Sequence, residues 1–363
     1  EVFEDKKQRE RWLGITQAFA SVGGLFVTSI NLWIISHGKD LPHLGLPLLN
    51  NATDPSSWRY LLMTGFFPAI PIALMLPFVP ESKVWRERRA SGTMKRPSFG
   101  ALFSPELRRT TLVTAALSAC AYGIAFGALQ LTPLRISPGL PEVADHGKAM
   151  GPLRAEAAKL SEAFVAAPAD SPERAELLTK LKENRAAQEP HDKAIKQVGS
   201  KIQLAQEFGG LTGRILLAVL LVVAITRRSL LRLFVLPGLI VAPLTYFYLF
   251  HQGATAFSFG MALCGLLVVA QFSYFGEFLP KVFPIHLRGT GGSFATNVGG
   301  RMIGTSMAFV TSTMVAPMIS GDPARVLPMH IAKAAGIVAV TMFGIAFLLS
   351  FFLPEPKEEA AKE

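Results

Sequence analysis

The sequence predicts an all-α polytopic membrane protein with eight transmembrane helices and an extramembrane helical insert. Half of its 363 residues are hydrophobic and only 17% are charged, which is too apolar for an ordinary soluble enzyme of this length. A helix needs about 20 apolar residues to cross a hydrocarbon core about 30 Å thick. Eight stretches reach or approach that length, at residues 13–35, 60–79, 112–131, 208–225, 233–250, 257–276, 292–318 and 334–353.

Charged residues are almost absent from these stretches. Six contain none, whereas the fourth contains Arg214 and the seventh contains Arg301. The net charge is +10, but proteins that bind nucleic acid concentrate Lys and Arg on one solvated face. Here the basic residues lie between apolar runs, so we expect a lipid bilayer and no nucleic acid as partner. Cys120 and Cys264 both lie inside apolar stretches, and no disulfide framework is expected.

The basic residues predict the orientation, because short loops rich in Lys and Arg stay in the cytoplasm. The short loops of one side hold few basic residues, among them Lys39, Arg59 and Arg325. The other side holds Lys6, Lys7, Arg9, Arg11, the basic residues of 83–109, Arg227, Arg228, Arg232, Lys281, Arg288, Lys357 and Lys362. We therefore expect both termini, including the tail 354–363, to be cytoplasmic in a plasma (inner) membrane.

Two connections between the stretches are long. Residues 81–109 form a basic, predicted cytoplasmic linker that separates two helices from the other six. Residues 134–206 are predicted to lie outside, because long loops are exempt from the charge rule. This second connection is rich in Ala, Glu and Lys, and a Pro at 168 divides it before a helix start signal at residues 170–173. Its first part has helical spacing at Leu153, Ala157, Leu160 and Phe164. We expect two or three amphipathic helices, which form a solvated structural insert or bind a partner.

Three segments resemble the major facilitator superfamily, specifically its sugar-porter-like and organic-acid proton symporter branches. The first lies on both sides of the second apolar stretch. The next runs from the end of the sixth stretch into the seventh and has two parts, and the last is the exit from the eighth. They consist of Trp58 and Arg59 with Pro80, Glu81 and Ser82; Tyr274, Gly276, Glu277, Pro280, Arg288, Gly289, Thr290 and Gly291; Asn297, Gly300 and Arg301; and Leu353, Pro354, Glu355 and Pro356.

This resemblance implies that the eight stretches are helices five to twelve of a twelve-helix fold, so the chain is expected to be a fragment that lacks helices one to four. Residues 1–80 would supply the last two helices of the amino-terminal half. Residues 110–353 would form the complete second half, interrupted by the insert 134–206.

The same resemblance implies secondary active transport of a small polar solute by alternating access, with a proton as the coupling ion and no cofactor. An organic anion is favoured over a sugar, because the third stretch offers only Tyr122 and Gln130 where sugar porters carry paired glutamines. No enzyme signature or metal-binding histidine pair is present in the sequence. The alternative is a transport-inactive receptor or scaffold that acts through the insert.

Arg301 is the sharpest candidate for solute binding. An ionisable group in hydrocarbon costs roughly 2.5–3.5 kcal/mol on insertion scales, so it should face water or a partner. Ser293, Asn297, Arg301 and Thr305 recur every four residues and share one helix face. In the functional interpretation, the Arg301 guanidinium recognises a carboxylate or organises a gate. The alternative is that Arg301 belongs to a buried structural ion pair. Arg214 either adds a second positive charge to the same cavity or extends to the membrane interface.

The end of the sixth stretch contains the candidate gate. Glu277 either carries a proton or, as the resemblance favours, joins a cytoplasmic salt-bridge network with Arg288 and neighbouring arginines. Glu81 is expected in the same gate. Gln271 and Tyr274 lie on nearby turns and are further candidates for solute binding.

Overall fold

The computed structural model describes residues 6–37, 41, 57–79, 86–87, 90–92, 98–168, 171–222 and 226–354. These residues are all-α and contain eight helices long and apolar enough to cross a membrane. The candidate spans are Ile15–His37, Arg59–Phe78, Arg108–Gly139, Pro172–Val222, Arg227–Gln252, Ala254–Val282, Ile285–Ser320 and Pro328–Ser350. Each overlaps one predicted stretch, so the chain is an integral membrane protein with multiple candidate spans.

The α-helices account for most of the described chain, and short π-helical and 3₁₀ turns join or interrupt them. Their bounds are α1 (Lys6–His37), α2 (Ser57–Thr64), α3 (Phe66–Met75), α5 (Arg108–Gly127), α6 (Ala144–Ala166), α7 (Pro172–Val222), α8 (Arg227–Pro243), α9 (Ala254–Val282), α10 (Arg288–Ser293), α11 (Met307–Phe309), α12 (Ala316–Ser320) and α13 (Pro328–Ser350). The π-helical turns are Thr132–Ile136, Leu244–Tyr248, Phe294–Gly304 and Val310–Val315.

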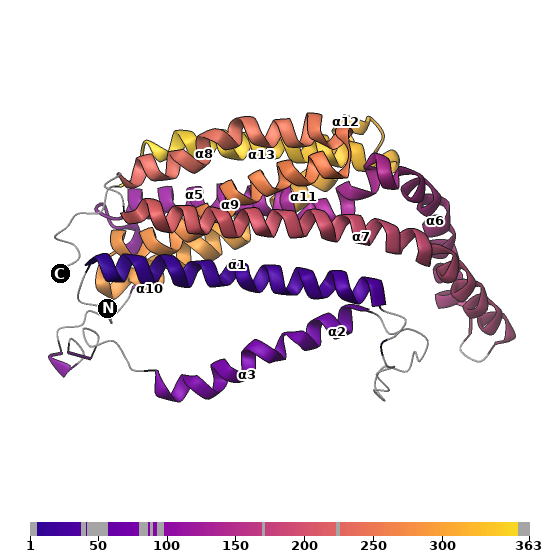
Figure 1. The fold of residues 1–363 in the computed structure, drawn as a ribbon, viewed down its shortest axis with the longest axis horizontal. Helices are drawn as coiled ribbons and strands as arrows, with labels where there is room; N and C mark the ends of the chain where they lie inside the picture. Colours follow the sequence, from indigo (N-terminus) through magenta and orange to yellow (C-terminus); the bar gives the residue numbers. More distant parts are fainter. Residues whose placement is uncertain are drawn as a thin grey trace.

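The long helices lie side by side in one bundle (Figure 1). α7 packs against α9 on one side and α1 on the other, while α13 packs against α5 and α8. Large aromatic side chains fill the centre, and Phe234, Tyr246, Phe257, Phe278 and Phe343 are all at most 1% exposed. Both cysteines are free and buried, as the sequence predicts.

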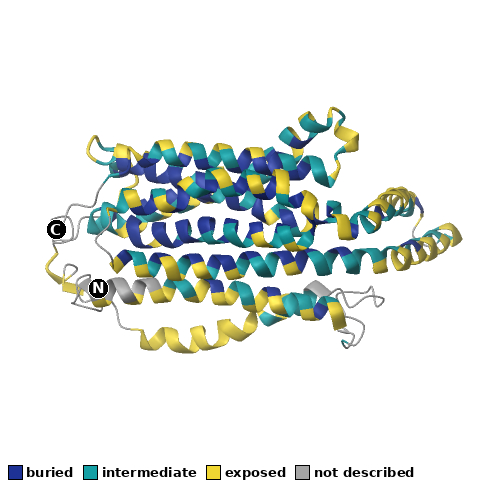
Figure 2. Ribbon diagram, turned by 45° about the horizontal axis from the view of Figure 1, so that its top comes forward, coloured by how far each residue is buried: buried dark blue, intermediate teal, exposed yellow. Residues whose placement is uncertain are grey.

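The helix α3 stands apart from this bundle, and α2 meets the bundle at α1 (Figure 2). The apolar window of their span contains no buried residue, and Phe66, Phe67 and Phe78 are at least 70% exposed. In water such a surface would promote aggregation, whereas lipid tails are as apolar as the side chains they would contact. The exposed face therefore agrees with a membrane location.

Basic residues gather at one end of the bundle, which we call the basic end. Arg228 Nε donates to the Leu353 carbonyl oxygen at 2.6 Å, and Arg232 Nε donates to Ser350 Oγ at 2.9 Å. The Arg109 guanidinium lies 5.9 Å from the centroid of the Phe352 ring. These arginines come from loops that the sequence assigns to the cytoplasmic side. The side of the membrane that the basic end occupies stays a prediction.

The second part of the predicted insert and the fourth span form one continuous helix, α7. α6 ends at Ala166 and α7 begins at Pro172, as the proline and the helix start signal predict. α7 has 51 residues, or about 77 Å at 1.5 Å per residue, so its amino-terminal half extends with α6 beyond the rest of the bundle (Figure 1). However, Ile195, Ile202 and Gln206 are buried. The last turns of the predicted insert therefore belong to the bundle, because they present one apolar face despite their charged residues.

The predicted topology can be tested on the helical hairpin of α6 and α7. We expect cysteines introduced as Ala166→Cys and Ala187→Cys, both at exposed positions, to react with a membrane-impermeant maleimide on intact cells. Cys120 and Cys264 are buried and give a low background. Ser91→Cys, exposed in the predicted cytoplasmic linker, is the matched control that should react only after the cells are opened. The reverse pattern would contradict the orientation.

Small residues let α7 approach the α9 backbone closely. A β-carbon added at Gly209 would overlap the Ala262 carbonyl group, and one added at Gly213 would overlap that of Leu266. We expect Gly209→Ala to destabilise the protein by about 1–3 kcal/mol, because a rigid backbone lies in the way. The control Gly23→Ala meets no atom within 4 Å and should be neutral or slightly stabilising. Equal unfolding midpoints in detergent would show that α7 and α9 do not pack this closely.

Candidate functional site

A line of polar contacts, which we call the polar seam, runs between the antiparallel helices α1 and α7. On α7 it repeats every seven residues, at Ser200, Glu207 and Arg214. Asn31 Nδ2 donates to Ser200 Oγ at 3.2 Å, and Arg214 Nη1 donates to the Gln17 carbonyl oxygen at 2.6 Å. Between these contacts, the Glu207 carboxylate packs against Gly24. The repeat of seven keeps these residues on one face of α7.

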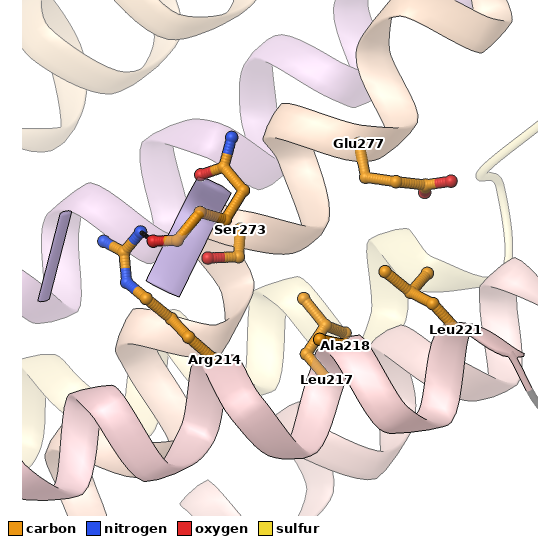
Figure 3. Close-up of a pocket in the computed structure, with 7 residues that line it drawn as sticks. Arg214, Leu217, Ala218, Leu221, Ser273 and Glu277 are labelled. Carbon is orange, nitrogen blue, oxygen red and sulfur yellow. Dashed lines mark hydrogen bonds between the residues drawn. The ribbon is translucent and has the colours of Figure 1, made fainter. Parts of the chain in front are cut away.

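A small cavity adjoins the end of the polar seam at Arg214. Its wall consists of Gln17 from α1, of Ser273 and Glu277 from α9, and of Arg214, Leu217, Ala218 and Leu221 from α7. Figure 3 shows Arg214 at one end of this cavity and Glu277 at the other. The cavity volume is ≈ 10 Å³, which is about the least that holds one water molecule.

Several polar atoms around this cavity are buried without a partner. Arg214 Nε, Ser273 Oγ and Glu277 Oε2 make no hydrogen bond within the described residues, and neither does Ser21 Oγ, one turn from Gln17 on α1. A buried polar group without a hydrogen bond costs about 1–3 kcal/mol. Such groups in one place indicate a site that receives water, a proton or a polar solute.

Glu277 lies between two cations towards the basic end. Its side chain is 2% exposed, and its Oε1 pairs with Lys281 Nζ and with Arg227 Nη2, the latter at 3.2 Å. The Tyr274 hydroxyl donates to the Arg227 carbonyl oxygen at 3.0 Å and so helps to hold the amino end of α8 against α9. The structure thus joins Glu277 to an arginine of a neighbouring loop, as a salt-bridge network requires.

The remaining residues of the candidate binding set lie outside the cavity. Gln271 is 1% exposed, and its Nε2 donates to the Leu267 carbonyl oxygen of its own helix at 3.1 Å. Tyr122 packs against Gly300 and Gly304, and its ring centroid lies 4.8 Å from that of Phe272. Gln130 is exposed. These three are not brought together with Arg214.

The polar stripe of Arg301 lies on the exposed side of its span. Ser293, Asn297 and Arg301 are all exposed, and Thr305 is partly exposed. Asn297 and Arg301 lie in the π-helical stretch Phe294–Gly304, and π-helical turns are frequent at functional sites. Arg301 forms no ion pair with any residue that the structure describes.

Arg288, another predicted gate residue, is not among the residues that line the cavity. Arg288 begins α10, beyond the end of α9. Glu81 lies outside the described residues. The expected roles of both stay predictions.

The sequence analysis missed four polar residues that the structure brings together, Gln17, Ser21, Glu207 and Ser273. Glu207 falls between the predicted insert, which ends at residue 206, and the predicted fourth stretch, which begins at residue 208. The seven-residue interval between Glu207 and Arg214 was the available signal, because it places both on one helix face. Nothing in α1 alone indicates that Gln17 and Gly24 face this helix.

Comparisons with known proteins do not identify a family. No protein-family description, no curated protein and no solved structure matches the chain.

Proposed function

We propose that the protein is a secondary active transporter of the major facilitator type. It moves a small polar solute by alternating access, an organic anion in preference to a sugar, and couples this movement to protons. The observation that carries the proposal is the group of buried ionisable and unpaired polar side chains around the cavity between α1, α7 and α9. In membrane spans such groups are costly and mark pathways for ions or solutes.

The position of Arg301 supports the same function. It is 16 residues after Ile285 and 19 before Ser320, the ends of its candidate span, so its side chain is too far from either interface to extend there. An arginine that faces lipid at mid-span costs roughly 2.5–3.5 kcal/mol on insertion scales. We infer that its stripe faces a water-filled pathway and that its guanidinium binds the carboxylate of the solute.

Counterflow tests transport directly. The full-length protein, with any sequence upstream of Glu1, is reconstituted into vesicles loaded with unlabelled lactate, succinate, citrate or glucose. We expect labelled carboxylate, and less labelled glucose, to enter above the level of empty vesicles. No counterflow of any of these solutes would contradict transport of the proposed solute class.

Arg301 variants test the binding role. Arg301→Lys keeps the charge but loses the planar, bidentate fork, so we expect weaker uptake with a raised KM. Arg301→Ala should abolish uptake. Arg325→Ala is the matched control, because Arg325 lies in an outer turn with its side chain 86% exposed. Uptake by Arg301→Ala at the rate of the control would remove Arg301 from the mechanism.

A further inference from the structure

Glu207 lies near the middle of the bundle. It packs against Gly24, which is 9 residues from one end of the α1 candidate span and 13 from the other, or about 14 Å and 20 Å. The carbonyl group of its neighbour Gln206 packs against Gly265, which is 11 and 17 residues from the two ends of α9. Both partner helices therefore place this carboxylate deep within a hydrocarbon core about 30 Å thick.

The surroundings of Glu207 offer one counter-charge. Between Gln17 and Ser36, α1 has no ionisable side chain. The middle of α9 contributes only Cys264, whose thiol donates to Thr245 Oγ1 of the turn after α8 at 3.6 Å. Arg214, two turns further along the same face of α7, attracts the Glu207 carboxylate. Within the described residues this carboxylate accepts no hydrogen bond and forms no salt bridge at contact distance.

This setting differs from that of Glu277, which is buried. Glu277 is held by two cations, Arg227 and Lys281, which stabilise its ionised form. Glu207 has only Arg214, and Arg214 is already hydrogen-bonded to the Gln17 carbonyl oxygen. An ionised Glu207 is therefore costly here and a protonated one is neutral, and the attraction of Arg214 favours the ionised form.

The polar seam extends from Glu207 towards both ends of the bundle. In one direction lie Ser200 with Asn31, and then Lys193, whose Nζ donates to the Ser36 carbonyl oxygen at 3.3 Å. In the other direction, Arg214 leads to the cavity with its unpaired buried polar atoms. Polar residues of the seam thus lie on both sides of Glu207 along α7.

We propose that Glu207 is the proton-binding carboxylate of the transport cycle, an inference that rests on the transport function proposed above. An O–H bond forms on a carboxylate oxygen with a proton from water on one side of the membrane. This neutral acid no longer attracts Arg214, which is then free to bind an anionic solute. Return of the proton to water on the other side restores the carboxylate and its attraction to Arg214, and the solute is released.

Carbodiimide labelling tests proton binding without any solute. Dicyclohexylcarbodiimide reacts with a protonated carboxyl group in a membrane: the oxygen adds to the central carbon of the reagent and the proton moves to its nitrogen. We expect mass spectrometry of the full-length protein to find Glu207 modified, with less labelling as the pH rises. Glu277 is the internal control and should stay unmodified. Glu207 that remains unlabelled at every pH would overturn the proposal.

Transport by Glu207→Gln tests the coupling. We expect this variant to lose accumulation of lactate, succinate or citrate driven by a pH gradient, down to the level of empty vesicles, and to keep exchange of the same solute without a gradient. Glu183→Gln, exposed on the same helix, should keep both. Gradient-driven accumulation by Glu207→Gln, or loss of exchange together with accumulation, would overturn the proton-binding role. A wild-type protein that exchanges none of these solutes would instead overturn the transport function, and the labelling would still report whether Glu207 binds a proton.

Discussion

Arg214→Ala is expected to abolish solute uptake. The substitution removes the donor of the 2.6 Å hydrogen bond to Gln17, leaves Glu207 without its counter-charge and enlarges the cavity beside Glu277. The hydrogen bond joins α7 to α1 and the attraction to Glu207 acts within α7, so both are lost at once. We expect uptake into vesicles to fall to background, although the protein still reaches the membrane.

Two further variants separate charge from geometry at this position. Arg214→Lys keeps the positive charge near Glu207 but lacks the planar fork, so we expect partial uptake and a raised KM. Arg185→Ala removes an arginine at an exposed position of the same helix and should leave uptake unchanged. Uptake at the wild-type rate by Arg214→Ala, normalised to the amount of protein in the vesicles, would show that the cavity has no part in transport.

Glu277→Ala is expected to cause the largest loss of stability. The carboxylate is 2% exposed, while the side chains of its partners Arg227 and Lys281 are 15% and 26% exposed. Removing the Glu277 carboxylate leaves two cations close together without a negative charge between them. Breaking a buried ion pair in this way costs about 3–5 kcal/mol. We expect the low end of that range, because Lys281 can turn towards the bundle surface. The measurement is the unfolding midpoint in detergent.

A surface pair is the control for this effect. Lys180 Nζ and Glu176 Oε1 are 2.7 Å apart, but their side chains are 52% and 68% exposed. Glu176→Ala should therefore change the free energy of unfolding by at most about 1 kcal/mol. The double variant Glu277→Gln with Arg227→Gln should recover part of the loss, since only Lys281 is then left without its counter-charge. A midpoint in Glu277→Ala as high as in Glu176→Ala would contradict the buried network.

The number of spans could be predicted because it depends on local properties. Each span is a run of apolar residues long enough to cross hydrocarbon, and the bilayer thickness sets that length for every helix alike. The start of α7 was equally local, since Pro172 and Glu173 suit the first turn of a helix. The packing of α7 against the bundle, in contrast, does not follow from local properties. The turns around Ile195 and Ile202 carry charges on one face and an apolar surface on the other, and hydropathy averaged along the chain does not separate the two.

The candidate site could be predicted only in part. An arginine or a glutamate within an apolar run is conspicuous by itself, so Arg214 and Glu277 were identified from the sequence. Gln17, Ser21 and Ser273 are ordinary polar residues in their helices. Their importance depends on which other helix each one faces.

The sequence by itself determined that this protein has eight apolar helices suited to a membrane, that most Lys and Arg residues of the short loops fall in alternate loops, and that few ionisable residues enter the spans. Only the tertiary structure decided that α1 packs antiparallel to α7, that Glu207 faces Gly24, and that Arg214 and Glu277 border one cavity with Ser273. The physical reason is that hydrophobicity and helix propensity act over a few turns, whereas the pairing of helix faces depends on side-chain fit and polar contacts between segments almost 200 residues apart, as for Gln17 and Arg214, whose separation is 197 residues.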